Sequence, residues 1–277
     1  MPLVLAGLSS LVFGIADFAG GLATRRAPAI TVVWGAQVVG LAAIAAVAPM
    51  FSTGAAGGGP LLWGAGAGAA GAIGLVLLYH ALATTRISVA APVAAVVGTT
   101  LPILFGVVIG ERPAPLAWVG MVLAVPAVVL LSSSGRRDAG STRQAALLGA
   151  LAGVAFAMFG ILISRTGTDS GMWPLVAART ASVVLLGVGA LAWRRPLVAP
   201  RSTWGLMALS ALLDIAGNVL FLLAVRRELL SLVAVIMSLY PAATIALARI
   251  VLGERVIRHQ WSGLLLGAAA VVLIALG

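Results

Sequence analysis

The sequence predicts an all-α integral membrane protein with ten transmembrane helices, arranged as two inverted five-helix repeats. Three observations lead to this fold class. Apolar residues make up 62% of the 277 positions and charged residues only 9%, whereas a soluble domain is about half apolar and a quarter charged. Ten apolar runs are long enough to cross a bilayer, and a charged phrase recurs at an offset of 143 residues.

A chain this apolar has too little polar surface to face water, so the lipid bilayer is its first expected partner. All 17 basic residues are Arg, and with seven acidic residues they give a net charge of +10. Most of these arginines fall in or near loops between apolar runs, where lipid headgroups attract them. Nucleic-acid binding requires a clustered basic face, and we therefore expect no nucleic-acid partner.

Composition also argues against metal and redox chemistry. The chain has no Cys and only two His, which excludes disulfides and thiolate metal sites. We expect no cofactor, no metal and no enzymatic activity. Abundant Ala, Gly and Arg without Lys suggests a GC-rich bacterial genome, and hence a multi-pass protein of the bacterial inner membrane.

The apolar runs are predicted to be helices. A helix needs roughly 17–25 apolar residues to cross the hydrocarbon core, and lipid permits only helices or closed barrels. Breaks at Arg, at acidic residues and at Gly/Pro clusters divide the chain into segments of that length. The ten runs are 2–24, 29–50, 61–83, 87–109, 114–133, 145–164, 172–193, 203–224, 230–252 and 257–276.

One connection differs from the others, which are short. The stretch SSSGRRDAGSTR (132–143) is polar, rich in Gly and Ser, and lies near the middle of the chain. We interpret it as the linker between two halves. The predicted organisation is a first five-helix repeat at 1–133, a linker at 134–144 and a second, inverted repeat at 145–277.

The two halves share a phrase. Residues 110–130 placed over 253–273 match at ten of 21 positions, including Gly-Glu-Arg and a following Trp. Rare residues such as these do not recur in register by chance, so the chain is predicted to be a duplication of a five-helix unit. Because five is odd, the second copy enters the membrane upside down. Inverted repeats of this kind are typical of secondary transporters.

The repeated phrase is expected to be a structural turn. It lies between the last two helices of each unit, with Gly110 and Glu111 in the first half and Gly253 and Glu254 in the second. A carboxylate at a helix junction can cap backbone donors and meet an Arg or a lipid headgroup. Inversion would place the two turns on opposite faces of the membrane.

Three features carry a family resemblance: the order of the ten runs, the late stretch with SLYP, LGER and QWSGLLLGAAAVVL, and its counterpart GERPAPLAWVGMVLAVPAVVLL. In these features the chain resembles the EamA-domain members of the drug/metabolite transporter superfamily. The resemblance covers essentially the whole chain, once per half, and implies transport or export of small organic metabolites. Two departures suggest that the halves have specialised. Pro241 is replaced by Gly98 in the first half, and Gln37 stands at about the place where the second half has Arg179.

Few ionisable side chains lie inside the predicted spans, where each costs about 2.5–3.5 kcal/mol on insertion scales and is therefore a functional candidate. Asp214 is near the centre of the eighth run, and Arg179 is inside the seventh. The two residues equally suit a structural ion pair that locks two helices. The candidates for the substrate or ion pathway are Asp17, Tyr79, His80, Thr99, Arg179, Asp214, Asn218, Ser238 and Tyr240.

Each of the other candidates also has a structural interpretation. Asp17 could be solvated near the interface. His80 would suit proton coupling, since it titrates near neutral pH, but it equally suits an interfacial position beside Tyr79.

Hydroxyl groups and small residues fit helix packing as well as transport. Ser238 and Tyr240 precede Pro241, where they could donate hydrogen bonds to carbonyls that Pro leaves free. Helix packing alone would also account for Thr99. The stretch GAGAGAAGAIG (64–74) is interpreted as a tight packing face, because it has neither the Lys nor the preceding strand of a phosphate loop.

Two signals disagree on orientation. Eleven arginines fall in loops after odd-numbered runs and four on the opposite side, which by the positive-inside rule places both termini outside the cytoplasm. The resemblance implies that both termini are inside. An even number of spans puts the termini on one side in either case.

The predicted function is a secondary transporter, favoured as an exporter, of small organic metabolites such as amino acids or drug-like amphiphiles. Its substrate is expected at the midplane among runs 1, 3, 4, 6, 8 and 9. An intramembrane enzyme acting on lipid or prenyl substrates would want an acidic or His/Asp cluster near one interface, and a membrane scaffold would have no use for inverted repeats. Substrate, direction, proton coupling and the choice between monomer and homodimer stay open.

Overall fold

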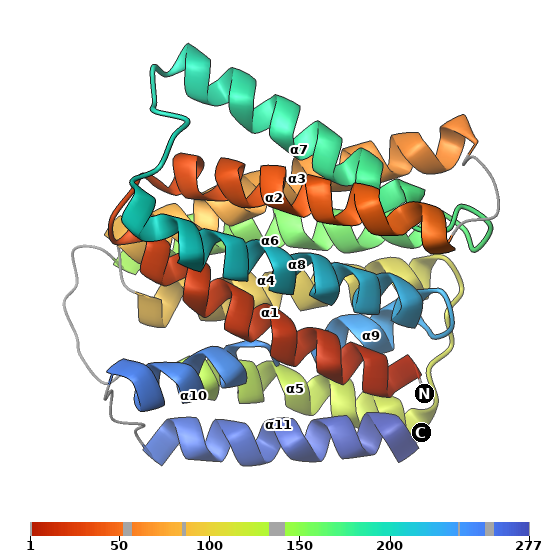
Figure 1. Ribbon diagram of the computed structural model, residues 1–277. Coiled ribbons are helices and arrows are strands. Elements are labelled where there is room, and N and C mark those ends of the chain that lie inside the picture. Colours follow the sequence, from red (N-terminus) through yellow and green to blue (C-terminus); the bar gives the residue numbers. More distant parts are fainter. Residues whose placement is uncertain are drawn as a thin grey trace.

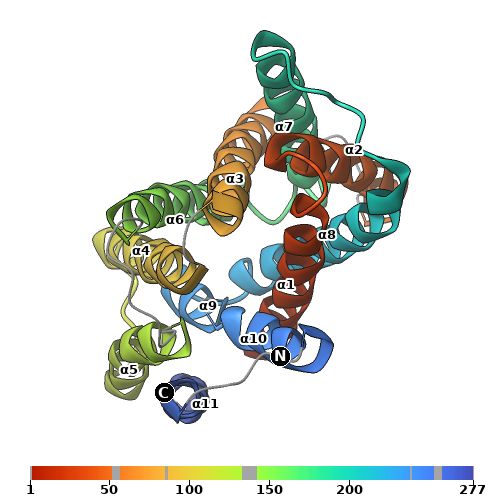
Figure 2. The same cartoon turned by 90° about the vertical axis from the view of Figure 1, so that its left-hand side faces the viewer.

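The computed structural model describes residues 2–51, 57–84, 87–132, 142–237, 239–252 and 258–276, which form helices and connecting turns without a strand. Figure 1 shows the helices running side by side across the bundle, and Figure 2 shows the same bundle seen along its helices. The start of α1 and the end of the last helix lie at the same end of the bundle (Figure 1). This placement agrees with an even number of chain crossings.

All ten predicted runs are helical, and their ends agree within a few residues. The predicted linker lies mostly outside the described residues, and its last residues already belong to α6. The helices are α1 (Pro2–Thr24), α2 (Ala29–Val47) with η1 (Ala48–Phe51), α3 (Gly58–Thr84), α4 (Ile87–Val108), α5 (Pro115–Ser132), α6 (Thr142–Ser164), α7 (Trp173–Ala192), η3 (Arg201–Thr203) with α8 (Trp204–Val225), α9 (Leu230–Met237), α10 (Pro241–Leu252) and α11 (Arg258–Leu276).

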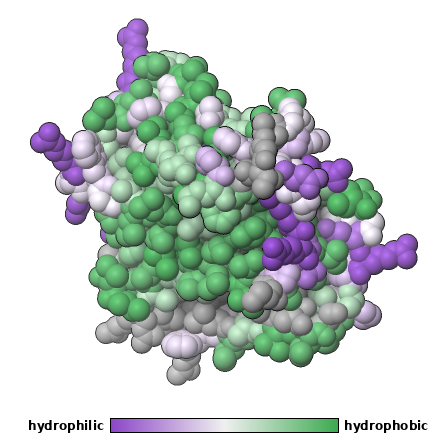
Figure 3. All heavy atoms as spheres, turned by 45° about the vertical axis from the view of Figure 1, so that its right-hand side comes forward, coloured by the Kyte–Doolittle hydropathy of each residue, from purple (hydrophilic) through white to green (hydrophobic). Residues whose placement is uncertain are grey.

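Within the described residues, six helical segments are long and apolar enough to cross a membrane, and shorter apolar segments occur in α4, α5, α9–α10 and α11. Figure 3 shows apolar side chains over the middle of one face and hydrophilic side chains toward its edges. Exposed apolar side chains of this kind require lipid as their solvent. The six segments are Pro2–Thr24, Ala29–Phe51, Gly58–Ala81, Arg143–Ser164, Trp173–Ala192 and Arg201–Val225.

The structure corrects one element, because the ninth run is two helices rather than one. α9 ends at Met237 and α10 begins at Pro241, as expected where Pro lacks an N–H group and disfavours a helical residue before it. Backbone groups at such a break need partners in lipid. The Ser10 hydroxyl donates to the Met237 carbonyl over 3.2 Å, so α1 covers the break.

The Gly-rich stretch 64–74 is a packing face, as predicted. A Cβ atom added at Gly64 or Gly68 would overlap the main chain of α7 at Pro174 or Ala178. Further along the same helix, Gly71 and Gly74 face aromatic side chains of α6. Small residues therefore let α3 approach two neighbouring helices closely, as is common in membranes.

The turn between α4 and α5 reaches across the molecule. Gly110 has a φ of +94°, a conformation that favours Gly. The carboxylate of Glu111 accepts hydrogen bonds from the backbone N–H groups of Leu230 (2.8 Å) and Ser231 (3.1 Å), at the start of α9. We expected a cap at the junction of the phrase itself, but the capped helix belongs to the other half. Its counterparts Gly253 and Glu254 lie outside the described residues.

Helix contacts between the halves are reciprocal. α1 packs extensively on α8, and α6 packs extensively on α3. At the offset of 143 residues α1 corresponds to α6 and α3 to α8, so these two contacts are equivalent. Helices that correspond to one another also meet: α2 contacts α7, and at the opposite edge of the bundle α5 contacts α11 (Figure 2).

We predict that Gly68→Ala destabilises the protein, because the new methyl group would meet the main chain of Ala178 rather than a movable side chain. Overpacking of this kind costs about 1–3 kcal/mol. The midpoint of thermal unfolding of the detergent-solubilised protein, followed by size-exclusion chromatography, should fall. Gly7→Ala is the matched control, since nothing lies within 4 Å of the added atom. Equal midpoints for the two variants would contradict this close contact.

Candidate functional site

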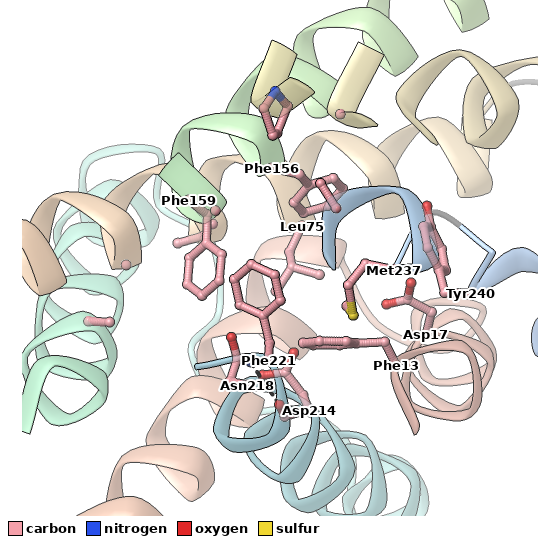
Figure 4. Close-up of a pocket in the computed structure, with 18 of the residues that line it drawn as sticks. Phe13, Asp17, Leu75, Phe156, Phe159, Asp214, Asn218, Phe221, Met237 and Tyr240 are labelled. Carbon is pink, nitrogen blue, oxygen red and sulfur yellow. Dashed lines mark hydrogen bonds between the residues drawn. The ribbon is translucent and has the colours of Figure 1, made fainter. Parts of the chain in front are cut away.

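A cavity of about 170 Å³ lies in the middle of the bundle, lined by residues of α1, α2, α3, α4, α6, α7, α8 and α9. A water molecule needs roughly 10–15 Å³ measured in this way, so the space suits a small organic molecule. The helices that line it include all those at which the sequence placed the substrate. Figure 4 shows the side chains that point into it.

Four Phe side chains, which we call the aromatic wall, form part of the cavity lining. Phe13, Phe156, Phe159 and Phe221 line the cavity, so that four of the seven Phe residues of the chain gather here. The rings of Phe159 and Phe221 lie in contact, with centroids 6.2 Å apart. None of these Phe residues was predicted from the sequence, although Phe is uncommon in a chain of Ala, Leu, Val and Gly.

A network of polar side chains joins three helices at the cavity. Arg179 on α7 donates from Nη1 to the amide oxygen of Gln37 on α2, and from Nη2 to the carboxylate of Asp214 on α8. The side chains of Arg179 and Asp214 are only 9% and 19% exposed. The structure thus brings together the two residues for which we considered an ion pair. It adds Gln37, which we had noted only as the counterpart of Arg179.

Asp17 on α1 forms a second polar group at the cavity, near Asp214 of α8. The Tyr79 hydroxyl donates to Asp17 Oδ1 over 3.4 Å. Among the described residues, no Arg or His forms an ion pair with this carboxylate. A pocket of about 10 Å³ lies beside Asp17, Tyr79, Ser210 and Asp214, which is about the size of one water molecule.

Two polar atoms at the cavity lack hydrogen-bond partners within the described residues. The Asn218 amide donates from Nδ2 to the Asp214 carbonyl over 2.7 Å, and within the described part of the chain its Oδ1 has no hydrogen-bond partner. The buried hydroxyl of Tyr240 also has none there. Figure 4 shows Tyr240 beside Asp17 and Met237, in the break between α9 and α10. Buried polar atoms of this kind usually mark a site that water or a ligand completes.

The remaining candidates have different positions. Thr99 lines the cavity, but its hydroxyl donates to the Ala95 carbonyl of its own helix over 2.7 Å. His80 is exposed and lines neither pocket, so the structure does not place it with the other candidates. Ser238 lies outside the described residues. Over the described part of the chain, no group of three or more His, Asp or Glu side chains could hold a metal ion.

The comparisons with known proteins give a family match over the second half of the chain and a shared fold over nearly all of it. A model of the EamA-like transporter family matches residues 143–276. A solved structure titled "Crystal structure of protein" aligns with a TM-score of 0.77 over 99% of this chain and 96% of that chain, at 18% identity. At this identity the likeness shows a shared fold. No curated protein sequence matches the chain.

We predict that breaking the Arg179–Asp214 pair from either side lowers the yield of folded protein, because it leaves one charge uncompensated inside the membrane. Loss of one partner of a buried pair typically costs about 3–5 kcal/mol. The double variant Arg179→Gln/Asp214→Asn should recover much of the yield that either single variant loses. Fluorescence-detected size-exclusion chromatography of the detergent extracts measures this. A double variant less stable than both single variants would show that the charges do not act as a pair.

Proposed function

We propose that the protein is a secondary transporter of small organic metabolites, because the model of the EamA-like transporter family matches residues 143–276. The match supports the resemblance seen in the sequence over the second half of the chain, and together with the long apolar helices it supports a multi-pass membrane protein. That family consists of transporters rather than enzymes. The central cavity is the observation that carries the proposal for this chain.

The cavity has the properties that a substrate pathway requires. Polar side chains from several helices meet inside an otherwise apolar bundle, and ionisable groups at such a depth are characteristic of transport pathways. Both halves contribute to the wall, with Asp17 and Gln37 from the first and Arg179 and Asp214 from the second. Any movement of one half against the other therefore changes the shape of the cavity.

Transport by alternating access between two inverted five-helix repeats is the mechanism that we propose. The repeated Gly-Glu-Arg phrase and the reciprocal helix pairs support it, because the contact of α1 with α8 is repeated by that of α6 with α3. Two copies of one unit in opposite orientation can exchange conformations and open a central site to each side in turn. The two repeats are residues 1–133 and 145–277.

Two contacts join the halves toward different ends of the bundle. Leu230 lines the cavity at the start of α9, where Glu111 caps the helix. Toward the other end, α1 lies directly against α10, and the Thr244 hydroxyl donates to the Gly14 carbonyl over 3.0 Å. Both contacts join one half to the other, so each is suited to form and break during transport.

We also propose export across a bacterial inner membrane, with a small molecule as the substrate and the lipid bilayer as the surroundings. Amino acids and drug-like amphiphiles are the classes to test first. The aromatic wall supports an amphiphilic substrate, because such side chains pack against apolar groups and attract cations.

We predict that Gly98→Leu abolishes transport, because Gly98 lines the cavity and its nearest neighbour, the Gly153 carbonyl, leaves ordinary contact distance for a Cβ atom (3.5 Å). The rest of the side chain then fills space that the substrate needs. Efflux and growth protection should be measured in cells expressing the protein, across amino acids, toxic analogues and amphiphilic drugs.

Gly7→Leu is the control, since this exposed position in α1 has open space around it. Both variants should reach the membrane in equal amounts, and only Gly98→Leu should lose the protection given by the unmodified protein. Full activity in Gly98→Leu would show that the substrate does not pass through this cavity. Absence of any protection by the unmodified protein would count against transport of these classes.

A further inference from the structure

We propose that the cavity binds a small organic monocation, an amphiphile with a protonated primary amine that pairs with Asp17. The inference rests on the proposed function and names the class of its substrate. It combines three features of the cavity: its unbalanced charge, its aromatic wall, and a buried amide oxygen that lacks a donor.

The charged side chains that line the cavity are Asp17, Arg179 and Asp214. The guanidinium of Arg179 is shared between Asp214 and Gln37, so its charge and that of Asp214 compensate one another. Asp17 has a hydrogen bond from Tyr79 and, among the described residues, no cation beside it. When Asp17 is ionised, the lining carries one carboxylate in excess, and a ligand with a single positive charge complements it.

The aromatic wall determines which chemical groups of the ligand can surround its positive charge. Figure 4 shows the ring of Phe13 next to Asp17, with Phe221 and Phe159 beyond it. The face of an aromatic ring attracts a cation within about 6 Å, and the rings bury the apolar body of a ligand. A carboxylate beside aromatic rings thus suits an amine with an aromatic or aliphatic body, and suits an anion poorly.

Asn218 indicates that the ligand also brings hydrogen-bond donors. Its side chain is buried, with the residue only 3% exposed, and it lines the cavity. Its nitrogen donates to the Asp214 carbonyl, which leaves Oδ1 as an acceptor without a donor among the residues that the structure describes. A primary amine offers three N–H donors to Asp17 and to such acceptors, whereas a quaternary ammonium offers none. Leaving buried acceptors unpaired disfavours the quaternary ligand.

The same contacts disfavour a zwitterionic amino acid. Its carboxylate would need a cationic partner in the cavity, and Arg179 already has two acceptors. With no net charge, the zwitterion also leaves the excess carboxylate of the lining uncompensated. The cavity should therefore prefer an amine to the amino acid with the same side chain.

Tyramine and four relatives test these features on the purified full-length protein in detergent. Binding of radiolabelled tyramine is measured by scintillation proximity, and unlabelled relatives compete with it. Tyrosol replaces the amine by a neutral hydroxyl, 4-hydroxyphenylacetate replaces it by an anion, N,N,N-trimethyltyramine keeps the charge without N–H groups, and tyrosine adds a carboxylate. Each relative should compete about tenfold or more weakly than tyramine, as expected for loss of a charge-assisted hydrogen bond or of charge balance.

Variants at Asp17 assign the preference to this carboxylate. Asp17→Asn should lower tyramine affinity about tenfold or more and remove the preference of tyramine over tyrosol, since it keeps the shape and removes the charge. Asp17→Glu should retain that preference. Asp169→Asn is the matched control, because Asp169 is an exposed acid in the turn between α6 and α7, and its affinity for tyramine should be unchanged.

Three outcomes would each overturn the proposal. They are undetectable tyramine binding, equal competition by tyramine and tyrosol, and a preference for tyramine that persists in Asp17→Asn. These outcomes are separate from failure of the transport function. If cells expressing the protein export another class of compound and Gly98→Leu abolishes that export, transport through the cavity stands and only the assignment of an amine substrate is rejected.

Discussion

The interaction on which the site depends is the contact of Arg179 with two acceptors inside the bundle. A guanidinium at this depth is tolerated only with partners, and Gln37 and Asp214 provide them from two other helices. The contact therefore fixes the relative positions of α2, α7 and α8 along one wall of the cavity. It also compensates the charge of Asp214, whereas Asp17 has no ion-pair partner among the described residues.

A second constraint acts on the backbone, because lipid offers no partner to a free carbonyl. The break between α9 and α10 is possible because α1 lies against it, where Ser10 donates to the Met237 carbonyl. The break in turn places Tyr240 at the cavity, out of the regular spacing of a helix. The helix interruption and the polar group at the site thus follow from one sequence feature, the Pro that begins α10, and the packing of α1 makes the interruption possible in lipid.

The helices could be predicted closely from the sequence because length and hydropathy alone determine which segments can lie in lipid. The charged part of the site could be predicted for the same reason, since Asp17, Arg179 and Asp214 interrupt apolar runs. The direction in which a side chain points could not. Tyr79 is buried beside Asp17 whereas His80 is exposed. The sequence could not predict this difference, because α3 is apolar on all sides and carries no periodic signal for its orientation. The aromatic wall was missed because Phe in an apolar helix resembles any other lipid-facing residue.

The Glu111 contact gives the repeated phrase a physical role that its local sequence does not reveal. Within one repeat, Gly-Glu-Arg is a turn between two helices, and a Gly with a φ of +94° is all that the turn itself requires. The carboxylate instead accepts the first free N–H groups of α9 in the other half, which a negative charge at a helix N-terminus stabilises. Because Leu230 is both a capped residue and part of the cavity wall, the turn is mechanically connected to the site. Glu is thus needed at this position to cap α9 in the second half, and not to form the turn. Through this cap, the position of α9 depends on the position of the first half.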